Sequence, residues 1–137
     1  MPCDMRLILA HKQSTSARVR FLCFEHGVCA FEPLPASSTF DEATEAPQVV
    51  LHPAAFLRTA ERRLGLPEGT LKHDPEFSAY VEAADGLISV NLALFATMDP
   101  PFLQAQTIGA RFISLTEARN FSDVELGLLR HAYPILV

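Results

Sequence analysis

The feature that most constrains this chain is a pair of strand-like apolar runs joined by a turn signal. Residues 76–82 and 87–98 are rich in apolar residues, and Ala84-Asp85-Gly86 lies between them. Asp-Gly strongly favours a tight turn between antiparallel strands, because glycine tolerates the positive φ that such a turn needs. The two runs are therefore predicted to form a β-hairpin.

Further strands are predicted in three other places, namely residues 5–10, 18–25 and 110–115, which are short apolar or alternating runs. His26-Gly27 has the composition of a two-residue turn, so residues 28–32 are predicted to return as a partner strand of 18–25. Residues 36–47 are rich in Ser, Thr, Ala and acids, and we expect a loop there.

One helix is predicted after His52. Pro53 suits the first helical position, and Gly65 suits the left-handed residue that ends a helix. Between them Phe56, Ala60 and Leu64 recur every four residues, with Leu57 beside them, which gives the helix one apolar face.

A second helix is predicted to begin at Ser122. Ser122 and Glu125 have the spacing of a capping box, and an acid at Asp123 suits the positive end of the helix dipole. Pro134 is expected to end this helix. Its inner face is predicted to carry three apolar side chains, namely Leu126, Leu129 and Tyr133.

This order of elements predicts an α+β chain, with a mixed sheet and a helix on each side of it. The length of 137 residues fits a single domain over residues 1–137. A chain of this size buries enough surface to fold without a disulfide or a structural metal.

Charge and composition exclude several kinds of partner. The formal net charge of −5 argues against general nucleic-acid binding and against binding to an anionic membrane surface. The apolar runs are too short and interrupted to span a bilayer. Cys23 and Cys29 lie in apolar runs, so we expect buried free thiols and a reduced, cytoplasmic compartment. No signal peptide pattern is seen at the N-terminal end.

Common catalytic and nucleotide-binding motifs do not appear in the sequence. The six glycines form neither a phosphate-binding loop nor a dinucleotide-binding fingerprint. The five histidines show no metal-ligand spacing, and no serine lies in the context of a hydrolase nucleophile.

Two segments resemble the Nudix hydrolase family. Residues 110–117, ARFISLTE, and the helix after them are similar to that family's late strand and closing helix. Residues 58–66, RTAERRLGL, are similar to the end of the family signature, R-E-U-x-E-E-x-G-U, where U is apolar. Arg58, Ala60, Gly65 and Leu66 match that signature. The resemblance implies a Nudix-like mixed β-sheet sandwiched between helices.

The signature's acidic positions are not acidic in this chain. Thr59 stands where the first glutamate belongs, and Arg62 and Arg63 stand where the glutamate pair belongs. Counting back along the full signature places Thr44 at its opening glycine and Val50 at an earlier glutamate.

These substitutions bear directly on the chemistry that the resemblance implies. Nudix enzymes hydrolyse nucleoside diphosphates linked to another group, with Mg²⁺ or Mn²⁺ held by glutamates of this motif. Such ions need anionic oxygen ligands, whereas a guanidinium accepts no hydrogen bond and stays charged. We therefore expect no catalytic residue, metal ligand or cofactor at this motif. The expected function is a non-catalytic ligand-binding or protein-interaction module.

The same substitutions suggest a ligand. Arg58 and Arg62 share a helix face, with Arg63 adjacent, and arginines can hold a phosphate or carboxylate by paired hydrogen bonds. These three arginines are the predicted ligand-binding residues, for a phosphate-bearing small molecule. The alternative is a solvated basic face paired with acids of the preceding loop.

Two other interpretations stay open. One is a divergent pyrophosphohydrolase whose Mg²⁺ is held by relocated carboxylates, namely Asp41, Glu42, Glu45 or Glu117. The other is an oligomeric protein, with residues 100–103 and 135–137 as apolar contacts. A homodimer is then the first candidate, because twofold dimers are the commonest soluble oligomers.

Overall fold

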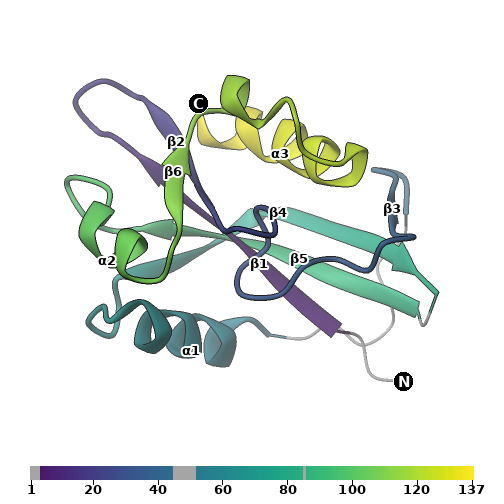
Figure 1. The fold of residues 1–137 in the computed structure, drawn as a ribbon, viewed down its shortest axis with the longest axis horizontal. Coiled ribbons are helices and arrows are strands. Elements are labelled where there is room, and N and C mark those ends of the chain that lie inside the picture. The colour runs from purple at the N-terminus through teal and green to yellow at the C-terminus, as the bar shows by residue number, and fades with distance from the viewer. Residues whose placement is uncertain (1–3, 45–51, 85) are drawn as a thin grey trace.

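The computed structural model describes residues 4–44, 52–84 and 86–137. Six strands in this part of the chain form one sheet, in the order β3-β4-β5-β1-β2-β6 (Figure 1). The strands are β1 (Asp4–Lys12), β2 (Val19–Cys23), β3 (Thr39–Phe40), β4 (Leu71–Ala83), β5 (Gly86–Phe95) and β6 (Arg111–Ile113). The helices are α1 (Ala54–Leu64), α2 (Phe102–Thr107), the short 3-10 helix η1 (Leu115–Ala118) and α3 (Asp123–Leu136).

The sheet is mixed because one of its strand pairs is parallel and the others are antiparallel. β1 runs parallel to β5, from the pair Asp4 and Ile88 to the pair Ala10 and Leu94. Its other neighbour, β2, is antiparallel, as are the remaining strand pairs. The predicted α+β class with a mixed sheet is confirmed, and so is the hairpin of β4 and β5.

The two faces of the sheet are buried by different helices. Successive side chains of a strand point to opposite faces, and in β1 Leu7 and Leu9 join a core cluster with α1. Ile8 and Ala10 join a second cluster with α3. Figure 1 shows α1 below the sheet and α3 above it. The site described below lies on the α1 side.

Helix α1 forms where the sequence predicts it. Pro53 is its N-cap residue, and Gly65 ends it in the left-handed conformation at φ 70°. Leu57, Ala60 and Leu64 are buried as predicted, but Phe56 is 41% exposed. Phe56 therefore lies at the rim of the apolar face and not within the core.

Helix α3 begins as predicted, because the Ser122 hydroxyl accepts a hydrogen bond from the backbone N–H of Glu125 at 3.3 Å. The prediction that Pro134 ends it is wrong, since the helix continues to Leu136. Pro134 loses only its own bond to the carbonyl four residues back, and the buried Leu136 anchors the last turn. The inner face is also rotated from the predicted one: Leu126 and Tyr133 are only partly buried. Its buried residues are Leu128, Leu129, Ala132 and Leu136.

The predicted strand over residues 28–32 does not form. Within this segment Cys29 forms an isolated bridge with Ile8, and Phe24 and Gly27 form another at the turn before it. Both edges of β2 are already used by β1 and β6, so no edge remains for a hairpin partner. The segment instead lies beside β1, where the backbone N–H of Ala30 donates to the carbonyl oxygen of Leu7 at 2.7 Å.

Two elements were not predicted from the sequence. β3 lies inside the predicted loop and pairs with β4, while residues 45–47 of that loop fall outside the described part. Helix α2 follows directly after Pro101, its N-cap residue. Within the described residues, no helix has both the length and the hydropathy needed to cross a membrane.

Candidate ligand-binding site

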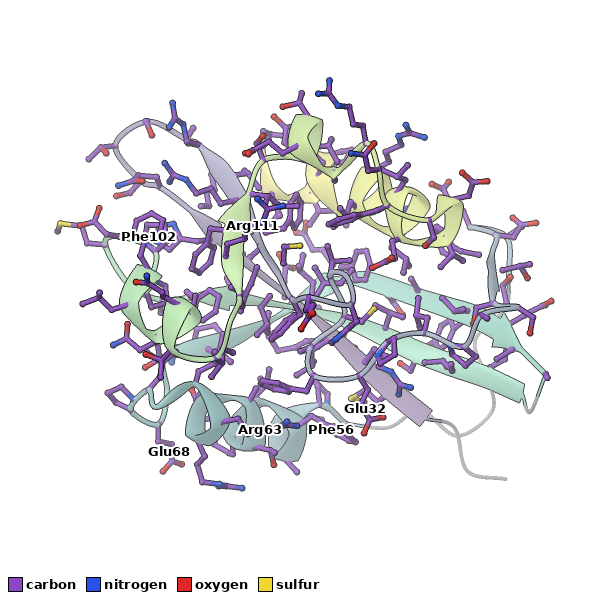
Figure 2. All side chains as sticks on the ribbon, in the orientation of Figure 1. Glu32, Phe56, Arg63, Glu68, Phe102 and Arg111 are labelled. Atoms are coloured by element: carbon purple, nitrogen blue, oxygen red, sulfur yellow. The ribbon has the colours of Figure 1, made fainter. Side chains whose placement is uncertain are left out.

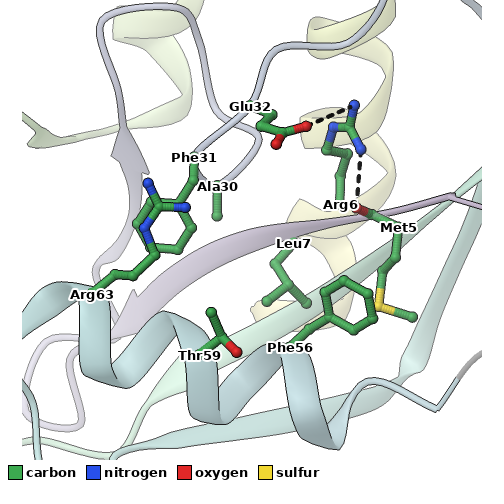
Figure 3. A pocket seen from close by; sticks show the side chains of 9 residues that line it. All are labelled: Met5, Arg6, Leu7, Ala30, Phe31, Glu32, Phe56, Thr59 and Arg63. Carbon is green, nitrogen blue, oxygen red and sulfur yellow. Dashed lines mark hydrogen bonds and ion pairs between the residues drawn. The ribbon is translucent and has the colours of Figure 1, made fainter.

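A pocket of about 200 Å³ opens between α1, β1 and the segment that follows β2. Figure 3 shows the nine residues that line it, which are Met5, Arg6, Leu7, Ala30, Phe31, Glu32, Phe56, Thr59 and Arg63. Apolar side chains and three charged groups line it together. It therefore offers contact to an apolar body and polar contact to a charged group.

Helix α1 contributes Phe56, Thr59 and Arg63, which recur at three- and four-residue spacing and so share one helix face. The neighbouring face, with Leu57 and Leu64, is buried against the sheet and fixes how the helix is turned. Figure 2 shows Phe56 and Arg63 near Glu32.

Arg63 is held by an aromatic ring. Its guanidinium carbon lies 4.0 Å from the centroid of the Phe31 ring, a cation–π contact. Phe31 has φ 68°, in the left-handed region that bulky residues seldom adopt. Phe24 supports the Phe31 ring edge-on, with centroids 5.3 Å apart. The stack orients the guanidinium while leaving Arg63 exposed to solvent.

A second cation lies at the other side of the pocket (Figure 3). Arg6 is only 8% exposed, and its Nη2 lies 3.7 Å from a carboxylate oxygen of the exposed Glu32. Arg6 also donates to the carbonyl oxygens of Met5 and Pro33, at 3.1 and 3.3 Å. Two guanidinium groups and one carboxylate therefore line the pocket, which leaves an excess of positive charge.

The three predicted arginines do not lie in one place. Arg58 and Arg62 line a different hollow of about 150 Å³, with Glu61 and Glu68 as its acids. Arg58 Nε lies 3.1 Å from Glu61 Oε1, and its Nη1 lies 3.7 Å from Glu68 Oε1. Arg62 donates to the Thr59 hydroxyl at 3.3 Å. Arg63 faces the other side of the helix, toward Phe31.

Glu61 fixes the position of α1, and this role was not predicted from the sequence. It is 1% exposed, and its Oε2 accepts a hydrogen bond from the backbone N–H of Leu71 at 2.8 Å. The helical spacing does indicate that Glu61 is buried, because it lies four residues after Leu57 and three before Leu64, on the apolar face of the helix. An acid at such a position needs a buried partner, and here it joins α1 to β4.

A second hollow, of about 250 Å³, adjoins the pocket. Its lining residues are Phe24, Glu25, His26, Phe31, Arg63 and Ile108. Phe31 and Arg63 line both spaces, so their stack forms a shared wall. This hollow could not be predicted from the sequence, since its residues come from segments far apart in the chain.

The carboxylates proposed as relocated metal ligands have structural partners. Asp41 Oδ1 accepts from the backbone N–H of Ala43 at 2.9 Å. Glu42 Oε1 lies 3.1 Å from His131 Nδ1.

Glu117, the remaining described candidate, caps the 3-10 helix η1. It accepts hydrogen bonds from the backbone N–H and the hydroxyl of Ser114, at 2.9 and 3.0 Å, and these lower its pKa. Glu45 and Val50 lie outside the described residues, and Thr44 follows β3 in an irregular segment. Among described side chains, no three or more His, Cys, Asp or Glu gather closely enough to hold a metal ion.

The two described cysteines are buried free thiols, as predicted. Burial raises the pKa of Cys29 to about 12, with a smaller contribution from the negative charge of Glu125. Burial also raises the pKa of Cys23. Because a thiolate is the reactive form of cysteine, neither thiol has the character of a nucleophile.

Comparison with known proteins gives information on the fold. No protein-family model and no curated protein matches the sequence. The crystal structure of an Ap4A hydrolase from C. elegans, a Nudix enzyme, is similar with a TM-score of 0.55 and 16% sequence identity. The match covers 99% of this chain and 100% of that one. The chain therefore has a Nudix-like α+β fold.

Proposed function

We propose that this chain is a non-catalytic Nudix-like domain that binds a small anionic ligand through Arg63, without a metal ion. One observation carries the proposal. The face of α1 that lines the pocket presents Thr59 and Arg63, at positions where the Nudix resemblance implies metal-binding glutamates. A hydroxyl and a guanidinium replace carboxylates there, so the helix offers hydrogen-bond donors to an anion.

The geometry around Arg63 suits direct anion binding. Stacking on Phe31 at 4.0 Å occupies one face of the guanidinium and leaves its N–H edge for hydrogen bonds to a phosphate or carboxylate. Arg6 adds a second positive charge, partly balanced by Glu32. The apolar side chains of Met5, Leu7 and Phe56 then contact the uncharged part of the ligand.

The other two arginines take different roles in this proposal. Arg58 is held by Glu61 and Glu68, so its charge serves to fix the helix. Arg62 is exposed on the far side of α1 from Phe31, where it adds a positive charge without lining the pocket.

The similarity to an Ap4A hydrolase supports a second candidate function, a metal-dependent hydrolase of nucleoside polyphosphates. That reaction would need Mg²⁺ beside α1. The side chains that α1 presents to the pocket do not fit this ion, because Thr59 is neutral and Arg63 would repel it.

The proposal is tested by thermal unfolding of the purified protein with AMP, ADP, ADP-ribose and Ap4A, each with and without Mg²⁺. A ligand that binds only the folded protein raises stability, by about 2.7 kcal/mol at a hundred times its Kd. We expect stabilisation that does not require Mg²⁺, is lost in Arg63→Ala and is retained in Arg62→Ala. Arg62 is a matched control because it is the same residue type on the next position of the same helix.

Two results would overturn the proposal. Stabilisation that requires Mg²⁺, together with release of AMP from Ap4A, would establish the hydrolase. Stabilisation that is unchanged in Arg63→Ala would place the ligand elsewhere.

A further inference from the structure

We propose that Phe31 is the positioning residue for Arg63, and that the strain in its backbone is retained because it fixes the direction in which Arg63 donates hydrogen bonds. The inference rests on the proposed function, since Arg63 is the group that would bind the anion. It deepens that function by separating the residue that binds from the residue that orients it.

The backbone of Phe31 has an unfavourable conformation. Its φ is 68°, in the left-handed region that few bulky residues adopt, because the side chain comes too close to the backbone. A conformation of this kind lowers stability and persists only where the surrounding structure imposes it. Ala17, at φ 54°, is the other non-glycine residue with positive φ in the described part of the chain, and it lies in the exposed turn between β1 and β2.

The chain is held on both sides of Phe31. Immediately before it, the backbone N–H of Ala30 donates to the carbonyl oxygen of Leu7 at 2.7 Å. Two residues after it, the carbonyl oxygen of Pro33 accepts a hydrogen bond from Arg6 Nη2 at 3.3 Å. Because Leu7 and Arg6 both belong to β1, the backbone of Phe31 cannot relax without breaking one of these contacts to the sheet.

The ring of Phe31 has a fixed place as well. It contacts the ring of Phe24 edge-on, with centroids 5.3 Å apart, and Phe24 is only 8% exposed. The Arg63 guanidinium carbon lies 4.0 Å from the Phe31 ring centroid, and Figure 3 shows the guanidinium lying across that ring. A different φ at Phe31 would turn the ring away from both partners, so the cation–π contact depends on the strained backbone.

The neighbouring Arg58 shows why an aromatic ring suits this role. Arg58 is oriented by carboxylates, with Glu61 3.1 Å from its Nε and Glu68 3.7 Å from its Nη1, and these acids engage its donors and balance its charge. The Phe31 ring contacts only the face of the Arg63 guanidinium, so the N–H donors and the charge stay available for an anion. Ordering a long side chain in advance also reduces the entropy that is lost when a ligand binds.

Two conservative variants test the role of the ring, with AMP as the probe and without Mg²⁺. Phe31→Leu keeps a large apolar side chain but has no aromatic face, and we expect it to weaken AMP binding about tenfold through loss of the cation–π contact. Phe31→Tyr restores the aromatic face and should bind AMP within about twofold of the parent protein. Isothermal titration calorimetry measures both affinities.

The NMR signal of the Arg63 Nε–Hε group reports the position of this side chain in the absence of ligand. The ring current of Phe31 should shift the proton to lower frequency, and the signal is identified by its absence in Arg63→Ala. We expect the shift to disappear in Phe31→Leu and to return in Phe31→Tyr. A role of Phe31 in packing alone would not produce this pattern.

The strain is tested by comparing glycine with alanine at position 31. Both substitutions remove the ring, but only glycine adopts a positive φ without a steric cost. Phe31→Gly should therefore unfold at a temperature about 3 °C higher than Phe31→Ala, while both bind AMP at least about tenfold more weakly than the parent protein. Ala17→Gly is the matched control, because Ala17 does not line the pocket: it should raise the unfolding temperature and leave AMP binding unchanged.

The two proposals fail in distinguishable ways. If AMP binds through Arg63 but Phe31→Leu binds it as well as the parent protein does, this inference is overturned alone. It is also overturned alone if Phe31→Tyr restores neither the Arg63 signal nor the affinity, or if Phe31→Ala is at least as stable as Phe31→Gly. If AMP does not bind, or if Arg63→Ala binds it as well as the parent protein does, the proposed function fails and this inference fails with it.

Discussion

The carboxylate of Glu61 accepts a hydrogen bond of 2.8 Å from the backbone N–H of Leu71, and so joins the middle of α1 to the first residue of β4. The same carboxylate forms an ion pair with Arg58. The helix that lines the pocket is thus fixed to the sheet by a buried polar contact as well as by apolar packing.

Replacing Glu61 by alanine should lower the free energy of unfolding by about 2 kcal/mol, because a hydrogen bond to a charged group is lost and the Leu71 N–H stays buried. Denaturation by urea measures this change. Glu68→Ala is the control, since Glu68 is 82% exposed and surface changes are usually within about 0.5 kcal/mol. Equal effects of the two substitutions would contradict the structural role of Glu61.

Gly27→Ala should be more destabilising than Gly86→Ala. Both glycines have strongly positive φ, at 139° and 129°, so both substitutions strain the backbone. Only at Gly27 would the added methyl collide with the carboxylate of Glu125, whereas Gly86 has open space around it.

The collision should also break the 2.8 Å hydrogen bond from the Val28 N–H to Glu125 Oε2. We expect an excess of about 1–2 kcal/mol, the cost of a buried donor left without a partner, measured by thermal or urea unfolding of both variants. Equal losses at the two positions would show that Glu125 moves aside freely.

Stability at acid pH should depend on Glu117. Hydrogen bonds from Ser114 lower its pKa in the folded chain. A carboxyl group with a lowered folded pKa stabilises the protein above its unfolded pKa, and this contribution disappears as pH falls through the folded pKa. Wild type and Glu117→Gln should therefore differ in stability at neutral pH and converge in strong acid. A difference that is constant from pH 7 to pH 2 would contradict this linkage.

Cys29 should resist alkylation while the protein is folded. With a pKa of about 12, almost none of its thiol is ionised at pH 8, whereas an ordinary cysteine has a pKa of about 8.5. Iodoacetamide labelling followed by peptide mass spectrometry should show modification of Cys29 only after guanidinium unfolding. Rapid labelling in the native protein would mean that the thiol is accessible.

Local sequence signals predicted the elements whose determinants lie close together in the chain. The Asp-Gly pair in the sequence predicted the hairpin of β4 and β5, and Gly65 and Ser122 predicted one end each of α1 and α3. The strand predicted over residues 28–32 failed because its outcome depends on β6. No local sequence pattern predicts that β6, which is distant in the sequence, pairs with the edge of β2.

The candidate site was predicted only on its helical side. The family resemblance singled out Arg63 on α1, but the prediction grouped it with Arg58 and Arg62, which line another hollow. The contact between Phe31 and Arg63 could not be predicted, because it depends on an unusual backbone angle at Phe31 and on where residues 28–32 lie in the fold. Tertiary placement of a loop, and not the helix, decides which arginine meets the aromatic ring.

The parallel pairing of β1 with β5, in which Asp4 lies opposite Ile88, has a consequence for the order of folding. β1 lies in the middle of the sheet, and its partner β5 follows it in the chain only after α1 and β4. Closing so long a loop slows folding. Until it closes, β5 keeps an exposed edge that invites aggregation. During synthesis β1 therefore cannot pair with β5 until α1, β4 and β5 have been made.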